Sequence, residues 1–391
     1  MSLPPVKTRR VFYISGFDPR GGRHYHHLYR SEAQKQASLN GGTFAVGARS
    51  KTNGPYSAWP IRSTWGQDIH DCDYQFLAWD DLVRQHWHQS IPTTVLRCLS
   101  FYGAGLLSGG FNRVRKLSRG AFFTGVLPLL AFTLLPLLAV ALGILAFELL
   151  HSRSLPVYGA IAGLATVAAV LFASLRLLHH LGLLWLLRTY AFIEHWSNDP
   201  LPELEQRLES MADHILACHQ KDPLEETLII GHSIGTILAV CVVARLLEKT
   251  TRPLSPGSSP VPLPGFHFLT LGNCIPLLAL LPAAAAFRNR LALLASAPRI
   301  PWSDVSAPPD PLCFFQTNPF TVSNLPCEAP AYPRLCSARV FRMFKPETYK
   351  TIRWNKVRLH FQYLMAAELH TGYDFFAITA GPRPVEESLP E

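Results

Sequence analysis

Apolar and polar residues are distributed very unevenly along the chain. The 28 residues from Gly120 to Phe147 carry no charge, and a second uncharged run covers the 21 residues from Leu155 to Leu175. A helix needs about 20 predominantly apolar residues to cross the hydrocarbon core of a bilayer. Buried helices of soluble proteins rarely stay uncharged over such lengths. The pattern therefore predicts a transmembrane helical hairpin with a short connection around Arg153.

A third apolar stretch, Leu177–Leu187, lies between Arg176 and Arg188 and is too short to cross a bilayer alone. Two interpretations stay open. The stretch lies in the membrane interface with His179 and His180 toward the headgroups, or it extends the second helix of the hairpin.

Charges at the ends of the two uncharged runs predict the orientation of the hairpin. Only Arg153 lies in the connection, and the N-terminus lacks the apolar core of a secretory signal. The positive-inside rule thus places both flanking parts in the cytoplasm, in an integral protein of the inner (cytoplasmic) membrane. The eight cysteines show no CxxC pairing, so we expect free thiols and no metal site. The cations outside the connection are Arg113, Arg115, Lys116, Arg119, Arg176 and Arg188.

The polar parts of the chain alternate between short apolar runs and amphipathic segments. This alternation predicts an α/β fold with a mostly parallel sheet of about six strands. Three regions follow: residues 1–115 and 197–391 form the two halves of one α/β domain, and residues 116–196 are the inserted hairpin. Neither half has enough strands for its own sheet, so the halves must assemble. The predicted strands are Val11–Ser15, Tyr74–Trp79, Thr227–Ile230, Phe266–Leu271, Pro301–Ala307 and Arg339–Phe344.

Helices are expected between these strands, and turn-forming residues mark the loops. A β-hairpin is expected within Phe44–Arg62, where Asn53 and Gly54 follow each other. The Pro-rich stretches Thr251–Pro264, a loop or lid, and Cys313–Tyr332 are expected to be irregular. The last element is expected within Glu368–Ala380. The predicted helices are Leu28–Ala37, Asp80–Gln89, Leu201–His219, Gly235–Leu247 and Ala286–Ser296.

One short motif indicates chemistry. Gly231-His232-Ser233-Ile234-Gly235 follows a predicted strand and opens a predicted helix. In this strand–turn–helix context, a tight turn lifts the serine above the sheet, and the glycines avoid collisions with the crossing backbones. The helix N-terminus and the Ile234 N–H would stabilise a developing oxyanion. A Gly/Ser turn without chemistry is the simpler alternative.

The motif and the order of the surrounding elements resemble the α/β-hydrolase superfamily, although the family's first two strands have no counterpart here. The resemblance implies the chain order Ser, then Asp or Glu, then His. It places the acid in the turn after a strand, which favours Asp310 over Asp304, although an Asp beside Pro is also an ordinary turn residue.

The resemblance places the histidine after the last strand, which favours His360 over His370. In this arrangement Asp310 orients His360, and His360 takes the proton of Ser233. The second oxyanion donor is implied in the loop after an early strand, where the backbone N–H of Phe17 is the candidate. Basic and aromatic residues beyond it would rim the site or form a solvated face: Arg20, Arg23, His24, Tyr25, His26, His27 and Tyr29.

Composition agrees with a membrane protein and excludes other classes. Charged residues make up 16% of the chain, and hydrophobic residues make up 48%, which excludes intrinsic disorder. The net charge of +9 suggests nucleic acid or an anionic membrane as a neighbour, but the excess is largely beside the apolar runs. No P-loop or dinucleotide motif is present, so no cofactor and no nucleic acid are expected. The sequence thus predicts a membrane-anchored serine hydrolase that acts on an ester or thioester of a lipophilic substrate. An inactive scaffold and an acyltransferase remain the alternatives.

Overall fold

A single mixed sheet organises the protein. The computed structural model describes residues 4–52, 54–153, 155–251, 263–296, 300–325 and 332–390. Within these residues the strands form a nine-stranded sheet in the order β2-β4-β5-β1-β6-β7-β8-β9, with β3 beside β4. The expected α/β class with a mostly parallel sheet is confirmed. The strands are β1 (Thr8–Ile14), β2 (Gly42–Val46), β3 (Ser50–Lys51), β4 (Ser57–Trp65), β5 (Asp68–Phe76), β6 (Glu226–His232), β7 (Phe266–Leu271), β8 (Trp302–Ser306) and β9 (Arg334–Ser337).

The two parts of the chain that flank the apolar block share this sheet. Strand β1 pairs in parallel with β5 on one side and with β6 on the other, and β6, β7, β8 and β9 continue the parallel set. Strands β2, β3 and β4 extend the β5 edge in antiparallel fashion. The expectation of about six strands was therefore too low. The β3–β4 pairing agrees with the hairpin expected around Gly54.

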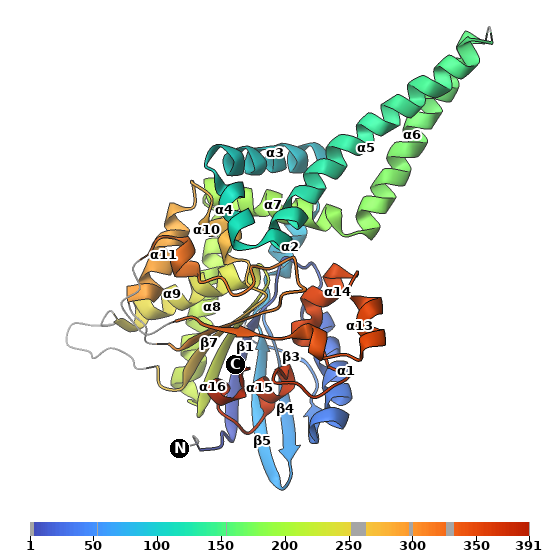
Figure 1. Cartoon of the computed structure of the whole chain (residues 1–391). Coiled ribbons are helices and arrows are strands. Elements are labelled where there is room, and N and C mark those ends of the chain that lie inside the picture. Colours follow the sequence, from blue (N-terminus) through green and yellow to red (C-terminus); the bar gives the residue numbers. More distant parts are fainter. Residues whose placement is uncertain are drawn as a thin grey trace.

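Helices cover both faces of the sheet (Figure 1), and each face has its own buried apolar cluster. Helices α7 to α11 pack on one face, and α1 and the C-terminal helices pack on the other. The helices outside the apolar block are α1 (Gly22–Asn40), α2 (Asp80–Trp87), α3 (Ile91–Leu107), α4 (Gly110–Leu117), α7 (Leu183–Asn198), α8 (Pro202–Lys221), α9 (Gly235–Thr251), α10 (Ile275–Ala279), α11 (Ala285–Ser296), α12 (Pro319–Val322), η1 (Val340–Arg342), α13 (Pro346–Ile352), α14 (Lys356–Phe361), η2 (Gln362–Leu364), α15 (Phe375–Ala380) and α16 (Val385–Ser388).

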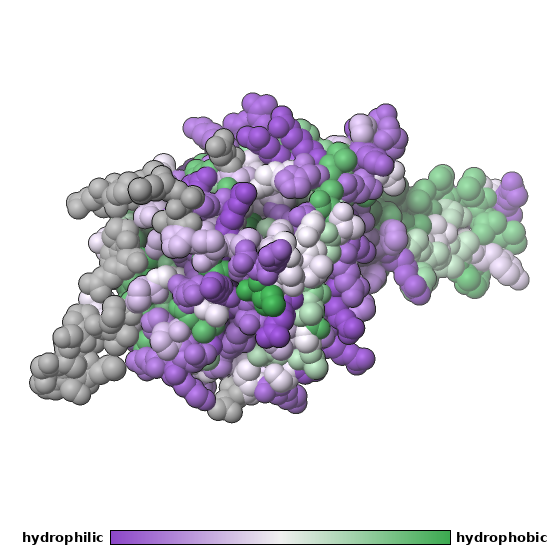
Figure 2. Space-filling view, turned by 90° about the horizontal axis from the view of Figure 1, so that it is seen from below, coloured by the Kyte–Doolittle hydropathy of each residue, from purple (hydrophilic) through white to green (hydrophobic). Residues whose placement is uncertain are grey.

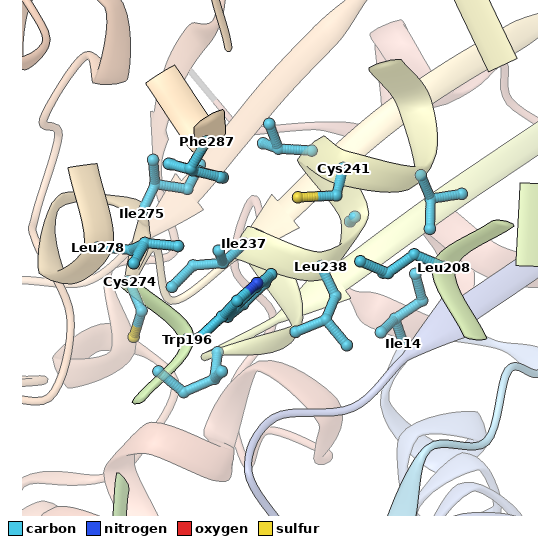
Figure 3. Packing of buried hydrophobic residues seen from close by; sticks show 14 of the residues in the cluster. Ile14, Trp196, Leu208, Ile237, Leu238, Cys241, Cys274, Ile275, Leu278 and Phe287 are labelled. Carbon is cyan, nitrogen blue, oxygen red and sulfur yellow. The ribbon is translucent and has the colours of Figure 1, made fainter. Parts of the chain in front are cut away.

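Helix α9 lies at the centre of the larger apolar cluster. Ile237, Leu238 and Cys241 on α9 are fully buried and meet side chains from β1, α7, α8, α10 and α11 (Figure 3). Trp196 of α7 belongs to the same cluster. A helix that follows the apolar block is therefore part of the core beneath the candidate motif. This packing fixes the start of α9, where the motif lies.

The apolar block forms two long antiparallel helices that project from the body. Helix α5 (Arg119–His151) and helix α6 (Pro156–His180) are both long and apolar enough to cross a membrane, and both are largely exposed. Figure 1 shows them extending away from the sheet, and Figure 2 shows their apolar surface beside a mostly polar body. Burial in a soluble core is therefore not the reason for their composition.

Three glycines bring α5 and α6 into close contact. Gly143 on α5 faces Gly163 on α6, where an added Cβ would lie 2.9 Å from the Gly143 carbonyl oxygen. Gly159 lies one turn away, and an added Cβ there would lie 2.9 Å from the Phe147 carbonyl oxygen. Gly159 and Gly163 form the G-x-x-x-G spacing that lets membrane helices approach closely.

Three expectations about local structure need correction. The stretch Leu177–Leu187 is divided between two helices: its first residues extend the second helix of the hairpin, which ends at His180, and α7 begins at Leu183. Gly182, with φ of 73°, makes the break between them. The strand expected at Arg339–Phe344 is a single helical turn, because Arg339, two residues after the end of β9, takes a left-handed φ of 47°. Helix α1 begins at Gly22, six residues before the expected start.

Two Pro-rich stretches lie only partly within the described residues. Most of the expected loop or lid at Thr251–Pro264 lies outside the described residues. Within Cys313–Tyr332, the short helix α12 interrupts the expected irregular path.

Candidate active site

The Gly231–Gly235 motif forms a strained turn between β6 and α9. Ser233 has a left-handed φ of 58°, which is unfavourable for a residue with a side chain. A Cβ on Gly231 would lie 2.6 Å from the Gly235 carbonyl oxygen, and a Cβ on Gly235 would lie 2.6 Å from the Ser15 carbonyl oxygen. Both glycines are thus sterically required. The Ser233 N–H donates to the Leu271 carbonyl 2.9 Å away, which fixes the turn against β7.

Asp310 and His360 form a buried pair. The His360 Nδ1 lies 2.8 Å from the Asp310 Oδ2, and both side chains are almost inaccessible to solvent. Tyr363 donates to the same carboxylate oxygen, and the Leu312 N–H donates to the other. Burial alone would raise the pKa of Asp310, but the charge and hydrogen bond of His360 bring it below its usual range. A carboxylate held in this way orients a histidine ring.

The two alternative residues lie elsewhere. Asp304 is fully buried in β8, where it accepts a hydrogen bond from Thr270 at 2.6 Å. Burial raises the pKa of Asp304 to about 7. His370 is exposed and lines a different cavity, together with Asn40 and Trp65. The structure thus brings Asp310, and not Asp304, to His360.

Ser233 and His360 line the same cavities, but they are not hydrogen-bonded in the part of the chain that the structure describes. The His360 Nε2 is buried and has no hydrogen-bond partner among the described residues, and the Ser233 Oγ lies 3.9 Å from the Cys274 Sγ. Catalytic hydrogen bonds are often long or misaligned before a substrate binds. The free Nε2 is the ring atom that a serine proton would reach, since Nδ1 is bound to Asp310.

Two backbone amides near Ser233 have no hydrogen-bond partner among the described residues: those of Phe17 and Ile234. Gly16 packs directly on Ser233, and an added Cβ at Gly16 would lie 2.8 Å from the Ser233 Cβ. Two indole groups hold the loop that carries Phe17, because Trp79 donates to the Ser15 carbonyl and Trp185 donates to the Phe17 carbonyl. Unpaired amides on a fixed backbone are suitable donors for an oxyanion.

A wide cavity of about 1110 Å³ opens beside Ser233. The Phe17 loop and α14 line it, and so do the ends of the membrane-type helices, which contribute Leu127 from α5 and His180 from α6. Ala121 of α5 also lines a second, narrow and mostly apolar pocket of about 20 Å³ that includes Ser233. The base of the α5–α6 hairpin therefore forms part of the wall around the candidate nucleophile. The sequence gives no sign that the hairpin lines this site, since the contact depends on where the ends of α5 and α6 lie in the folded protein.

The basic residues after Phe17 are divided between two places. Arg20 pairs with the buried Asp18 and lies over the Phe361 ring at 5.1 Å, so it rims the wide cavity. Arg23 to Tyr29 lie on helix α1, where Tyr25 and Tyr29 are buried and His26 contacts the Gly47 carbonyl. They do not form one cluster at the site.

His232 is a site residue that the sequence analysis did not assign. Its Nε2 lies 3.0 Å from the His360 backbone carbonyl, and its ring lies 5.1 Å from the His360 ring. Burial, reinforced by the neighbouring His360, lowers the pKa of His232 to about 3, so the ring is neutral. A carbonyl only accepts, so Nε2 carries the proton. His232 thereby positions the backbone of the residue that pairs with Asp310.

No group of three or more His, Cys, Asp or Glu side chains that could hold a metal ion occurs among the described residues. The cysteines within the described ranges are free: Cys72, Cys98, Cys218, Cys241, Cys274, Cys313 and Cys336. The eighth cysteine, Cys327, lies outside those ranges.

Comparison with known proteins gives no match: no family model, no curated protein and no solved structure is significantly similar to this chain.

Proposed function

We propose that the protein is a membrane-anchored serine hydrolase of the α/β-hydrolase type that cleaves an acyl ester or thioester of a lipophilic substrate. One observation carries the proposal. Ser233, held at a left-handed turn, lines the same cavities as His360, which is paired with the buried Asp310. A nucleophile and a base that line the same cavity, with an acid that orients the base, are the parts that acyl transfer to a serine requires.

In the proposed reaction, the Ser233 Oγ attacks the acyl carbon and its proton passes to the His360 Nε2. The Phe17 and Ile234 amides stabilise the oxyanion of the tetrahedral intermediate. The protonated His360 then gives its proton to the departing alcohol or thiol, and an acyl-Ser233 ester remains. Water attacks this ester with His360 as the base, which releases the acid and restores Ser233.

The preference for a lipophilic substrate follows from the walls of the cavity. Leu127 and His180 belong to the helices that would enter the bilayer, so a lipid could reach Ser233 without crossing bulk water. The narrow pocket at Ser233 has mostly apolar walls that include Leu277 and Phe314. Its volume of about 20 Å³ holds little more than one water, so an acyl chain there requires a shift of side chains.

We place the sheet domain on the cytoplasmic face of the inner membrane. Both flanks of the hairpin are rich in Lys and Arg, whereas the tip contains only Arg153. Because β1 and β6 pair with each other, both flanks must lie on the same side of the membrane.

The proposal is tested with detergent-solubilised full-length protein and p-nitrophenyl esters of increasing acyl length. Replacement of Ser233 by Ala is expected to abolish hydrolysis while the thermal transition remains. Replacement of the exposed Ser38 by Ala is the matched control and should leave the rate unchanged. Equal rates in all three proteins would exclude Ser233 as the nucleophile.

One observation favours a catalytically inactive scaffold instead. The Ser233 Oγ lies near Cys274 and is not hydrogen-bonded to His360. A scaffold predicts no ester hydrolysis in any of these proteins, whereas the proposed enzyme loses hydrolysis only when Ser233 is replaced. An acyltransferase would share the same acyl-Ser233 intermediate and would form an ester when an alcohol acceptor is added.

A further inference from the structure

Helix α3 has two apolar faces, and only one of them is covered. Thr94, Cys98, Phe101, Tyr102 and Gly105 are buried and lie on the face that packs against α7. The opposite face carries a stripe of leucines at helical spacing with exposed fractions between 53% and 91%: Leu96, Leu99, Leu106 and Leu107. Such a stripe on a helix is unfavourable in water and indicates a contact with an apolar medium or partner.

The segment that carries this stripe is strongly basic. No Asp or Glu occurs between Asp81 and Glu148. The cations Arg113, Arg115, Lys116 and Arg119 are exposed, and none of them forms an ion pair within the described residues. Arg97 differs, because it pairs with Glu194 on α7 at 3.2 Å. The four unpaired cations therefore remain available for an anionic surface.

The stripe and the cations are continuous with the base of the hairpin. Ser118 is both the C-cap of α4 and the N-cap of α5, so one residue separates the basic helix from the first apolar helix. In Figure 1, α3 and α4 lie on the side of the body from which α5 leaves, and α5 rises obliquely to the axis of α3. A bilayer that receives α5 must therefore pass close to α4.

The length of α5 supports an oblique placement in the membrane. Its 33 residues correspond to about 50 Å of helix, whereas the hydrocarbon core is about 30 Å thick. A hydrophobic stretch that is too long is accommodated by tilting. Tilt of the hairpin lowers the body toward the membrane, which brings α3 and α4 to its surface.

We propose that the exposed side of α3, together with α4 and the first turn of α5, lies in the interfacial layer of the anionic bilayer that the hairpin enters. We call this surface the α3–α4 face. Its leucines enter the boundary between headgroups and acyl chains, and its cations contact lipid phosphates. A second copy of this chain is a poorer occupant, because pairing two such faces would bring the unpaired cations together. The inference rests on the membrane-anchoring part of the proposed function and not on hydrolysis.

This contact would fix the depth of the site as well as the attachment of the protein. A second contact at α3–α4 holds the wide cavity, whose wall includes Leu127 and His180, at a constant height above the bilayer.

The experiment uses full-length protein reconstituted in vesicles with brominated acyl chains, which quench a fluorophore that reaches the hydrocarbon boundary. A solvatochromic label is attached at Leu106→Cys, at Leu138→Cys as the inserted control, and at Ser38→Cys as the exposed control. The protein without added cysteine supplies the background. We expect a blue shift and loss of fluorescence at positions 106 and 138, and no change at position 38.

Three outcomes separate the possible failures. Quenching at 138 without quenching at 106 would overturn the α3–α4 contact while leaving the hairpin inserted. No quenching at either position would overturn membrane insertion as a whole, without bearing on esterase activity. Energy transfer between copies labelled at 106, without lipid quenching, would show a contact between chains and would overturn the proposal.

The contribution of charge to the membrane contact is tested by comparing charge variants in anionic and in neutral vesicles. Replacement of Arg113, Arg115 and Lys116 by Gln should reduce the quenching at 106 in anionic phosphatidylglycerol vesicles, and less so in neutral phosphatidylcholine vesicles. Replacement of the exposed Arg30, Lys51 and Lys221 by Gln, an equal change in net charge, should have no effect. An equal loss in both triple variants would refute a specific lipid contact of α4.

Discussion

The strained backbone at Ser233 depends on the glycines that surround it. Its left-handed φ persists because Gly16, Gly231 and Gly235 leave room for backbones to cross at the turn. Strain of this kind is found at functional sites, where the surrounding structure maintains it. The sequence predicts this turn because the Gly-x-Ser-x-Gly spacing is local. It does not predict the rotamer that places the Ser233 Oγ near Cys274.

The two candidate partners of Ser233 could be predicted only because they follow the ends of elements. Asp310 and His360 are far apart in sequence, yet each comes after a predicted strand, and the structure brings them to 2.8 Å. His232 shows the limit of this reasoning. Its role depends on contact with the His360 carbonyl 128 residues away, and no local pattern indicates that contact.

Replacement of Asp310 and of Asp304 by Asn should have different effects on activity. Asp310→Asn removes the carboxylate that orients His360, and we expect kcat/KM to fall by up to about ten-thousandfold. Asp304→Asn is the matched control and should keep a rate close to that of the unsubstituted chain. Steady-state ester hydrolysis measures both. A slow Asp304→Asn and a normal Asp310→Asn would reverse the assignment.

We expect Asp304 to affect how the stability of the folded protein depends on pH. Burial raises its pKa to about 7 in the folded chain, against about 3.9 for an unfolded Asp. The folded state therefore keeps this proton up to a higher pH than the unfolded state does. As the pH rises from about 4 to 7, Asp304 therefore lowers the free energy of unfolding. We expect Asp304→Asn to become more stable relative to the unsubstituted chain over that range, as measured by thermal unfolding in detergent. A difference that is independent of pH would contradict the assignment.

At the scale of elements, the glycines between α5 and α6 determine how closely the hairpin packs. A side chain at Gly163 would collide with the Gly143 carbonyl, whereas the side chain of Ala160 is exposed. Gly163→Leu should separate the helices and destabilise the hairpin by roughly 1–3 kcal/mol, the usual effect of overpacking. Ala160→Leu should do neither. Distances between spin labels at Ile144 and Ile161 report the separation, and equal distances in both variants would refute the close contact.

Periodicity predicted whole elements better than their ends and connections. The long uncharged runs and the strands around the motif match the structure closely because their patterns are local. The strand expected at Arg339–Phe344 was wrong because the left-handed Arg339 ends the extended chain after β9. Strands β2 and β4 were missed as members of this sheet because β4 joins it by pairing with β5, and β2 joins it by pairing with β4.

At the scale of the whole molecule, the apolar block is both the proposed membrane anchor and part of the wall around the candidate site. Composition alone distinguishes an apolar insertion from a polar α/β domain. Nothing in the sequence indicates that Leu127 and His180 line the cavity of Ser233, or that α7 returns into the core. These contacts form only when the parts of the chain before and after the hairpin join through the pairing of β1 with β6.

The proposed topology predicts opposite accessibility at the two ends of the molecule. A cysteine at Ser152, in the hairpin tip, should react with a membrane-impermeant maleimide added to intact cells. A cysteine at Ser38 on α1 should react only after the membrane is permeabilised. The reverse pattern would place the sheet domain on the outer side of the membrane.

The most direct test of the central claim is covalent labelling of the full-length protein with a fluorophosphonate probe, followed by mass spectrometry of the modified peptide. If Ser233 is an activated nucleophile served by His360 and Asp310, the probe should attach to Ser233, and Ser233→Ala should remain unlabelled. Labelling should also slow sharply in Asp310→Asn, since His360 then loses its orientation. A folded protein whose Ser233 stays unmodified, or which is labelled equally after Ser233→Ala, would contradict the proposed enzyme.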